Sequence, residues 1–447
     1  MKERLVEGVK EIIETMEKRG LKGDVYGVNC RNIEYGIKKG ELTDSSEYDD
    51  VGLGIRVIKN GRLGFGFCTP GHEKKGLDQA IEFSKVSQKI DLEFPEESKV
   101  PDVKTFDRKV EKAISQGKGA DFTQELIDGC SSYADDILPT LGGVELFIGD
   151  EVVANTNGLF LEKTRTAMLG SVMATIPGEK TSITASEKEV SKRCDIDFEK
   201  VGIKSAEKVD SMREEIDLPP GDIPVMLGSR SLNQLFGFGL IPSFNGENVR
   251  KGKSVFSDRL NERVAHDRLI LKDDPTQDWG IGSSPFDDEG VVSRPSELIS
   301  EGVLKGFIYD LKEAQKSETT STGNGLRANF KSPPDITERN LVLRGKDIPY
   351  EELLPDGGIL VDDVMGAHTA NPVSGDFSVV ANPVWLIEDG EKKGRIQGVM
   401  LSGNLPELLD TIRFADDHKK TYMSIGSTSL RLDTPSARLD EVTVSGK

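Results

Sequence analysis

Histidine and cysteine are scarce in this chain, which limits the metal chemistry that short motifs could supply. The 447 residues include four of each, namely His72, His266, His368, His418, Cys30, Cys68, Cys130 and Cys194. No histidine belongs to an H-E-x-x-H or H-E-x-x-x-H string, and no two cysteines form a C-x-x-C pair. Because active zinc sites usually draw two ligands from one such string, the sequence argues against a zinc site on a local motif. Ligands scattered along the chain could still converge in space, so that alternative stays open.

Long apolar runs and long basic clusters are also absent. No segment approaches the ~18 consecutive apolar residues that a membrane helix needs, and the N-terminus leads into an amphipathic pattern without a signal-peptide core. Aspartate and glutamate number 77 against 58 lysines and arginines, which gives a net charge of -19. Such a field repels a phosphate backbone. Since the cysteines are also too widely spaced for a disulfide framework, we expect a cytoplasmic protein with no membrane and no nucleic-acid partner.

Hydrophobic periodicity predicts both helices and strands in the first half. Apolar residues at helical spacing predict helices over 3–18, 77–90, 122–137 and 198–212, with one more near the C-terminus over 405–414. Short apolar or alternating runs predict strands over 25–30, 33–37, 51–58, 63–67, 144–148, 152–155, 160–166 and 171–175. Turns are predicted at Asn60-Gly61, Gly149-Asp150 and Asn157-Gly158. Helices that flank runs of strands, without regular βαβ alternation, indicate the α+β class.

Composition divides the chain into three regions. We predict an N-terminal α+β subdomain over 1–90, a central α+β subdomain over 106–215 and a C-terminal β-rich domain over 222–447. The Pro- and charge-rich segment 91–105 is interpreted as a linker, and Leu218-Pro219-Pro220-Gly221 marks the clearest boundary. The N-terminal part is expected to be a two-layer α/β region with mixed sheets. The C-terminal domain should be a large, mostly antiparallel sheet with few helices.

Two loops in the second half could carry chemistry, although each also has a plain structural interpretation. The glycine-rich stretch 321–327, with Asn324 and Arg327, could present backbone N–H groups to an anion. It matches no phosphate-loop pattern, so a structural loop is the better interpretation. Asp362, Asp363 and His368 follow a predicted strand and could form a cation or acid/base cluster. No spacing rule favours that cluster over a solvated turn.

Long strings in the second half resemble those of a known family. They are RKGKSVFSDRLNERVA (250–265), TSTGNGLRANF (320–330) and GILVDDVMGAHTANPVSGDFS (358–378). The strings resemble the TldD/PmbA family, which pairs two kinds of subunit in a cytoplasmic metallopeptidase that degrades or matures peptides and unfolded segments. In the TldD-type subunit, an H-E-x-x-x-H motif and a cysteine near the C-terminus hold the metal.

The resemblance places the metal ligands of that family on residues that cannot replace them. The first histidine falls at Asn233, the glutamate at Gln234 and the second histidine at Phe238, while the cysteine falls around Thr421 to Met423. Asparagine and glutamine do not ionise at neutral pH, and phenylalanine has no lone pair for a metal. Glutamine also cannot take a proton from water. Together with the Gly-Asp-Phe-Ser run at 375–378, this implies a PmbA/TldE-type subunit that has no metal and no catalytic residue of its own.

The resemblance also implies partners and a substrate class. Zinc is expected only in a TldD-type partner, the substrates are expected to be peptides, and the chain should form a homodimer alone or a heterodimer with that partner. We expect a cleft for an extended peptide in the second half, with Asn324, Arg327 and His368 as candidate substrate-binding residues. Two alternatives stay open. One is an independently active metallopeptidase with non-standard ligands, and the other is a regulatory protein-binding module, suggested by the family's association with a DNA gyrase modulator.

Overall fold

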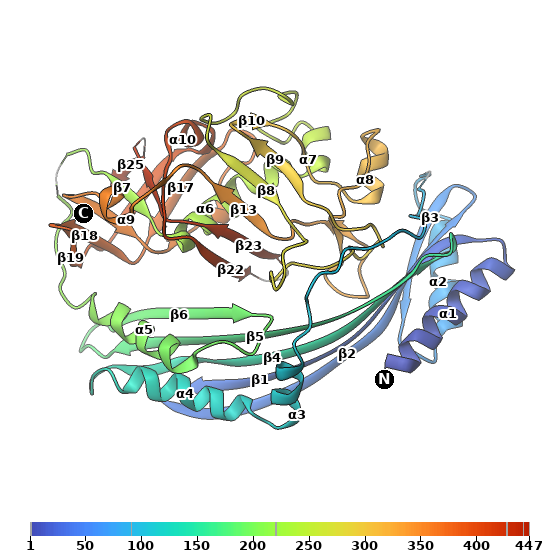
Figure 1. The fold of residues 1–447 in the computed structure, drawn as a ribbon, viewed down its shortest axis with the longest axis horizontal. Helices are drawn as coiled ribbons and strands as arrows, with labels where there is room; N and C mark the ends of the chain where they lie inside the picture. The colour runs from blue at the N-terminus through green and yellow to red at the C-terminus, as the bar shows by residue number, and fades with distance from the viewer. Residues whose placement is uncertain (1, 91, 220, 426–427, 441, 447) are drawn as a thin grey trace.

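A computed structural model describes residues 2–90, 92–219, 221–425, 428–440 and 442–446, and the side chains of 423–430 lie outside the description. Pro220 of the predicted boundary and the side chain of Met423 therefore lie outside the described residues. One large curved sheet forms the N-terminal half, and the C-terminal half lies over one face of that sheet (Figure 1). Helices cover the other face of the sheet.

The N-terminal sheet has six strands in the order β3-β2-β1-β4-β5-β6, and every neighbouring pair is antiparallel. The strands are β1 (Lys22–Lys38), β2 (Glu41–Lys59), β3 (Arg62–Cys68), β4 (Leu138–Asn155), β5 (Phe160–Ile176) and β6 (Ile183–Ser191). The mixed pairing expected for this region is therefore wrong. The turn at Asn60-Gly61 is confirmed, because both residues have positive φ between β2 and β3. The turn at Gly149-Asp150 is wrong, since both residues lie inside β4.

Two groups of helices cover the same face of this sheet at its two ends. They are α1 (Lys2–Lys18) and α2 (Glu73–Ser84) at one end, and α3 (Arg108–Ser115), α4 (Gly119–Ser131) and α5 (Phe198–Asp210) at the other (Figure 1). Strand β1 contacts both groups, since Val25 packs in the core under α1 while Ile33 and Ile37 pack in the core under α3 to α5. Because β1 pairs with β4, residues of the predicted 1–90 and 106–215 regions share a single sheet.

The opposite face of β1 and β2 packs against the C-terminal half. Alternation along the strand points Tyr26 and Val28 away from the helices, and both pack with Phe286 and Phe330. Gly52 of β2 allows this contact, because a Cβ added there would lie 2.3 Å from the Phe330 ring. One face of these strands therefore packs against the helices, and the opposite face packs against the C-terminal half of the chain.

The C-terminal half contains several sheets and few long helices. Its helices are α6 (Ser229–Gly239), η1 (Ile241–Phe244), α7 (Gly246–Arg250), α8 (Leu311–Lys316), α9 (Tyr350–Leu353), η2 (Ala367–Thr369) and α10 (Leu405–Thr411). Its first strands are β7 (Val225–Leu227), β8 (Ile270–Asp273), β9 (Ser296–Ser300), β10 (Val303–Leu304), β11 (Gly325–Leu326), β12 (Asp335–Ile336), β13 (Leu341–Arg344), β14 (Asp347–Ile348), β15 (Gly358–Val361) and β16 (Val364–Met365). The remaining strands are β17 (Asp376–Ala381), β18 (Val384–Glu388), β19 (Glu391–Arg395), β20 (Val399–Asn404), β21 (Arg413–Ala415), β22 (Lys419–Ile425), β23 (Thr428–Thr434), β24 (Ala437–Leu439) and β25 (Thr443–Ser445).

These strands form sheets in the orders β10-β9-β8-β13-β23-β22, β14-β21-β24-β7-β15-β18-β19, β16-β17-β20-β25 and β11-β12. Most neighbours are antiparallel, and the parallel pairs are β13 with β23, β14 with β21 and β15 with β7. The α+β class is confirmed, although the C-terminal strands divide among several sheets, two of them mixed, where one large sheet was expected. Within the described parts of the chain, no helix is long and apolar enough to span a membrane.

Candidate functional site

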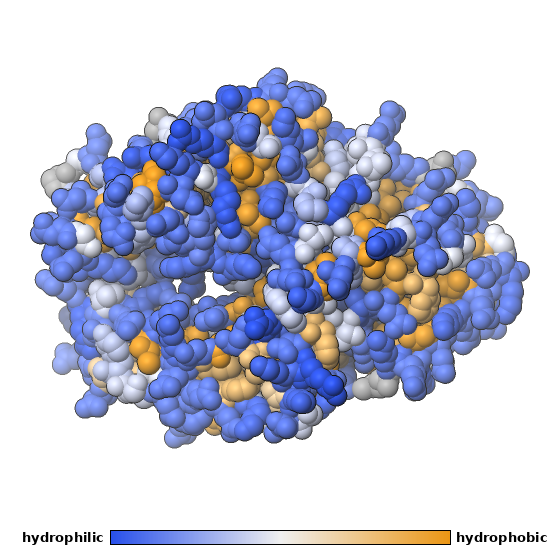
Figure 2. Space-filling view, in the orientation of Figure 1, coloured by the Kyte–Doolittle hydropathy of each residue, from blue (hydrophilic) through white to orange (hydrophobic). Residues whose placement is uncertain are grey.

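A cleft of about 1340 Å³ lies between the N-terminal sheet and the C-terminal half. Residues of β6 and α5 line one side, and residues of α6, β22 and β23 line the other. Figure 2 shows a hollow between the two halves with mainly hydrophilic residues around it. Nine lysines and arginines and nine carboxylates line the cleft, so its charge balances although the chain carries -19 overall. A neutral or zwitterionic ligand such as a peptide meets no net repulsion there.

Two strands with a free edge border this cleft. Strand β6 ends the N-terminal sheet, and β22 ends the sheet of β10, β9, β8, β13 and β23. Residues of both strands line the cleft. Edge strands present unpaired backbone N–H and C=O groups, which can pair with an added strand. Both walls therefore offer main-chain hydrogen-bonding groups.

Helix α6 carries two of the predicted motif positions to the cleft. Its apolar face, Leu232, Leu235 and Phe236, is buried in the core of the C-terminal half at helical spacing. Asn233 and Gln234 project on the cleft side and line it. The position of these two residues follows from the packing of the helix, because burying one face fixes where the other face points.

Asn233 meets the strand that carries the predicted cysteine position. Its Nδ2 donates to Thr421 Oγ1 at 2.7 Å, and Thr421 Oγ1 donates to the Leu432 carbonyl at 2.9 Å. The side-chain amide oxygen of Asn233, Oδ1, is buried and has no hydrogen-bond partner among the described residues. The structure thus brings together two positions that are 188 residues apart, and both were expected from the resemblance to lie at a metal site.

Gln234 is held by an acidic side chain from the loop after β15. Its Nε2 donates to Asp363 Oδ1, and Arg230 Nε lies 2.8 Å from Asp363 Oδ2. Burial raises the pKa of Asp363, and the guanidinium of Arg230 opposes that rise. An amide that donates to a carboxylate in this way orients the helix but cannot act as a general base.

Phe238, the third motif position, faces away from the cleft. It does not belong to the cleft lining, and its ring packs edge-on against exposed His368 on η2, with the ring centroids 6.5 Å apart. Residues 233 and 238 are five apart, so a regular helix turns their side chains to different directions. His368 is consequently near a predicted motif position but outside the cleft.

The residues at the predicted ligand positions do not fit a zinc ion. Asn233 turns its N–H₂ group toward Thr421, and Phe238 packs against a ring. The lining residues of the cleft include neither histidine nor cysteine, and the described residues contain no cluster of three or more possible ligands. Zinc prefers imidazole, thiolate and carboxylate ligands, so no catalytic step can be derived through a metal held by this chain.

Asp362 forms an ion pair that the sequence did not indicate. Lys208 of α5 places its Nζ 2.7 Å from Asp362 Oδ2 and also pairs with Glu187 of β6. Burial alone would raise the pKa of Asp362, but the nearby Lys208 ammonium holds it below its usual value. The predicted cluster of Asp362, Asp363 and His368 is therefore divided, because the two aspartates pair with separate cations while His368 lies elsewhere.

Asn324 and Arg327 lie outside the cleft lining and are buried. Asn324 Nδ2 donates to Asp273 Oδ2 at 2.7 Å and to the Thr337 carbonyl at 2.9 Å. The Arg327 side chain is 0% exposed, with Nη2 3.8 Å from Asp24 Oδ1. Burial lowers the pKa of the Arg327 guanidinium. The structure therefore does not bring Asn324, Arg327 and His368 together at a cleft rim.

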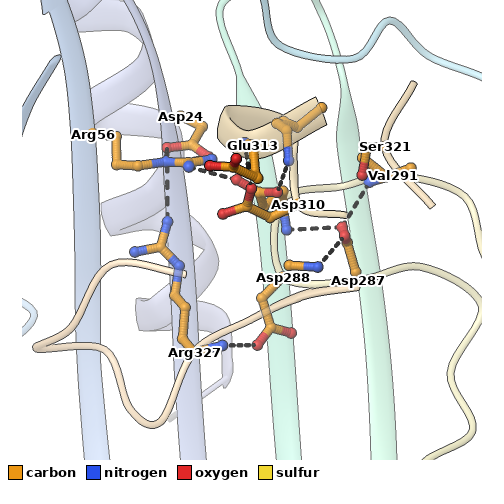
Figure 3. A network of polar contacts seen from close by, with 12 residues as sticks. Asp24, Arg56, Asp287, Asp288, Val291, Asp310, Glu313, Ser321 and Arg327 are labelled. Atoms are coloured by element: carbon orange, nitrogen blue, oxygen red, sulfur yellow. Dashed lines mark hydrogen bonds and ion pairs between the residues drawn. The ribbon is translucent and has the colours of Figure 1, made fainter. Parts of the chain in front are cut away.

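Arg327 instead belongs to a buried network of charged residues that joins the two halves (Figure 3). At its centre, Arg56 of β2 donates from Nη2 to Asp24 Oδ2 and from Nη1 to Glu289 Oε1, both at 2.5 Å. These three side chains are at most 2% exposed. On β5, Lys163 Nζ lies 3.4 Å from Asp288 Oδ1 and donates to the Phe286 carbonyl. The partners are far apart in sequence, so local patterns gave no signal for this network.

We expect the stability of the chain to fall as pH rises toward 7 because of Asp310 in this network. Burial, with the nearby charge of Glu289, raises the pKa of Asp310 to about 7, well above its value of about 4 in an unfolded chain. The folded state then binds the proton more tightly between these two values. For this one group the free energy of unfolding falls by up to about 1.4 kcal/mol per pH unit in that window.

Urea unfolding at pH 5, 6 and 7 checks this, with an Asp310→Asn variant. Asp310 caps α8 by accepting from the Glu313 N–H at 2.6 Å, and asparagine can cap a helix without titrating. In the Asp310→Asn variant the free energy of unfolding should change less with pH. Asp102→Asn, a substitution at an exposed position, should show the same change with pH as the unchanged chain. An Asp310→Asn variant with an unchanged slope contradicts the assignment.

Comparisons with known proteins agree with this architecture. The family model described as PmbA/TldA metallopeptidase C-terminal domain matches residues 220–446, and that described as PmbA/TldA metallopeptidase domain 1 matches residues 23–86. A protein of Methanocaldococcus jannaschii is 26% identical over 405 residues, covering 90% of this chain and 92% of that protein. A protein named metalloprotease from Methanothermobacter thermautotrophicus is 24% identical over 412 residues, covering 90% of this chain and 89% of its own length.

A solved structure is similar over nearly the whole chain. The crystal structure of TldE from Thermococcus kodakarensis superposes with a TM-score of 0.89 at 25% identity, covering 98% of this chain and 100% of that one. The likeness therefore includes both the N-terminal sheet and the C-terminal sheets that border the cleft. Since the C-terminal family model alone covers half of the residues, the chain belongs to the TldD/PmbA family.

Proposed function

We propose that this chain is the PmbA/TldE-type subunit of a cytoplasmic TldD/TldE-type metallopeptidase that acts on peptides or unfolded segments. In this proposal the chain holds no zinc and performs no catalysis. A TldD-type partner supplies the metal, and this chain handles the substrate. The TldE structure from Thermococcus kodakarensis, similar over 98% of this chain, supports the choice of subunit.

The contact between Asn233 and Thr421 carries the proposal. In the family resemblance these positions correspond to a metal-binding histidine and to the region of the metal-binding cysteine. Here they meet through an amide and a hydroxyl at 2.7 Å. The proximity of these two positions, with an amide and a hydroxyl in place of metal-binding groups, supports a subunit that has the family scaffold without its own metal site.

The free edges of β6 and β22 support a role in peptide handling. An extended peptide can add to a sheet edge through main-chain hydrogen bonds, which do not depend on its sequence. The cleft is large enough at about 1340 Å³ for a ligand bigger than typical small molecules. Both walls carry charged and polar side chains that can accept a polar backbone.

Reconstitution with a TldD-type subunit that has an intact H-E-x-x-x-H motif tests this function. Light scattering should give a homodimer for this chain alone and a heterodimer for the mixture. The mixture should cleave an unstructured peptide faster than the partner alone. A chain that stays monomeric and leaves the partner's turnover unchanged contradicts the proposal.

Two matched substitutions at the same motif position separate the roles of the subunits. A Glu→Gln change in the partner's motif should abolish cleavage by the pair, because it removes the general base. Gln234→Ala in this chain should lower turnover far less, since the Gln234 amide donates to Asp363 and cannot act as a general base. Loss of cleavage with Gln234→Ala would instead favour the alternative of an active site in this chain.

A further inference from the structure

Most charged side chains near α6 are already paired within the cleft wall. Lys208 is shared by Asp362 and Glu187, and Arg230 pairs with Asp363. These pairs neutralise one another at short range, so they leave little charge for a ligand. A ligand with its own charge must therefore be recognised by groups that remain unpaired.

Lys188 is a cation of this kind. It lies on β6, opposite Ser171 of β5, and lines the cleft. Its ammonium group lies over the Tyr422 ring at 4.7 Å from the centroid, and it has no ion pair or hydrogen bond with the described residues. A ring face attracts a cation but accepts no conventional hydrogen bond, so the N–H donors of the ammonium stay available.

The surroundings of Lys188 favour an anion. Tyr422 is on β22, next to Thr421 and hence next to the contact with Asn233. Arg230 is close enough to act on Lys188 electrostatically, and Arg431 lies over the same Tyr422 ring at 5.9 Å. The carboxylate with an effect on Lys188 is that of Glu145, on β4. Arg230 is paired with Asp363, and Glu338 acts on Arg431. The charge that stays available to a ligand at this place is therefore the ammonium of Lys188 over the Tyr422 ring.

The contact between Lys188 and Tyr422 also lies between the two free strand edges. Lys188 belongs to β6 and its ring partner Tyr422 belongs to β22, so the contact crosses the cleft. A peptide that pairs with either edge would pass this contact. The main chain of the peptide would form hydrogen bonds along the strand, and a carboxylate of the peptide would pair with the ammonium of Lys188.

We infer that Lys188, at the place where its ammonium lies over the Tyr422 ring, binds a carboxylate of the peptide, either its C-terminal carboxylate or the side chain of an aspartate or glutamate. This inference rests on the proposed function, because it names the chemical group that the peptide cleft selects. Lys188 forms the ion pair with the ligand. Tyr422 holds the lysine side chain across the cleft.

Four fluorescent peptides of one unstructured sequence test the inference on the full chain. They combine a free or amidated C-terminus with a central glutamate or glutamine, and binding is measured by fluorescence anisotropy at low and moderate salt. The form that provides the recognised carboxylate should bind about tenfold more tightly than its neutral counterpart, as expected of a charge-assisted hydrogen bond. A loss on amidation identifies the C-terminus, and a loss with glutamine identifies the side chain.

Three variants separate a specific contact from a general charge effect. Lys188→Gln should remove the difference between charged and neutral peptides, and Lys188→Arg should retain most of it. Lys346→Gln makes the same charge change at an exposed position outside the cleft and should retain the full difference. Thermal unfolding of each variant shows whether it is folded.

The outcomes also distinguish this inference from the function on which it rests. If the unchanged chain binds all four peptides equally, the carboxylate site is overturned while the peptide cleft stands. If it binds none of them, both are overturned. If Lys188→Gln stays folded and still prefers the carboxylate form tenfold, the recognition lies elsewhere and the inference fails.

Discussion

The isolated chain is expected to bind no stoichiometric zinc and to cleave no peptide. The positions that the family resemblance assigns to metal ligands hold Asn233, Gln234 and Phe238, and Phe238 packs against His368 outside the cleft. Neither an amide nor a phenyl ring replaces the imidazole and thiolate ligands that zinc prefers. Elemental analysis of the purified chain and cleavage assays with casein and with an unstructured peptide check this expectation.

A TldD-type subunit with an intact motif, purified in the same way, is the control. It shows that the purification does not remove the metal and that the assay detects cleavage. Stoichiometric zinc in this chain, together with cleavage that a chelator abolishes, would establish the alternative of an active peptidase with non-standard ligands. Stoichiometric zinc without cleavage would contradict the first part of the expectation, whereas cleavage that a chelator does not affect would indicate a contaminating peptidase.

Replacing Arg56 with methionine is expected to lower the free energy of unfolding by about 3–5 kcal/mol. The substitution leaves the carboxylate of Glu289 without its cation and that of Asp24 with Arg327 at 3.8 Å, and both carboxylates are 0% exposed. A buried charge that loses its partner bears its full desolvation cost. Arg56 forms ion pairs with residues of both halves of the chain. The substitution should therefore also weaken the association between the N-terminal and C-terminal halves. Urea unfolding measures the free energy, and limited proteolysis detects separation of the halves.

Arg31→Met provides the matched control on the neighbouring strand. Arg31 of β1 also pairs with a glutamate, Glu47 of β2, at 2.6 Å, but the two side chains are 44% and 47% exposed. An exposed ion pair contributes only about 0–1 kcal/mol. Equal losses for Arg56→Met and Arg31→Met would show that burial of the network does not determine its contribution.

The long strands of the first half show where sequence patterns stop being informative. The apolar runs 25–30 and 33–37 were predicted as two strands, but they are the two ends of β1. The interruption at Arg31 occurs where the strand passes from the core under α1 to the core under α3 to α5. A polar gap between two cores has the same appearance in sequence as a turn between two strands. The α1 helix was predictable because a single apolar face repeats along it.

The candidate site was predictable only where a family string or motif position marked it. The resemblance located Asn233 and the segment from Thr421 to Met423, and the structure brings Asn233 into contact with Thr421. Lys208 could not be found, since it reaches Asp362 across 154 residues. Arg327 was misleading for a physical reason. A glycine-rich loop with an arginine looks the same in sequence whether its anion comes from a ligand or, as here, from a buried aspartate.

Strand β5 connects the buried network to the cleft without a break. Lys163 near one end contacts Asp288 and Phe286 of the C-terminal half, and Ser171 further along pairs with Lys188 of β6. The eight intervening steps correspond to roughly 27 Å of extended chain, held throughout by the ladder to β4 and from Met168 onward also by the ladder to β6. The strand therefore acts as a stiff spacer between the contact at Lys163 and the cleft wall at Ser171, and this distant contact acts together with the pair of Lys208 and Asp362 across the cleft to set the separation of the walls. Widening the cleft for a bulkier substrate would require movement at that distant contact as well as release of the contacts that cross the cleft.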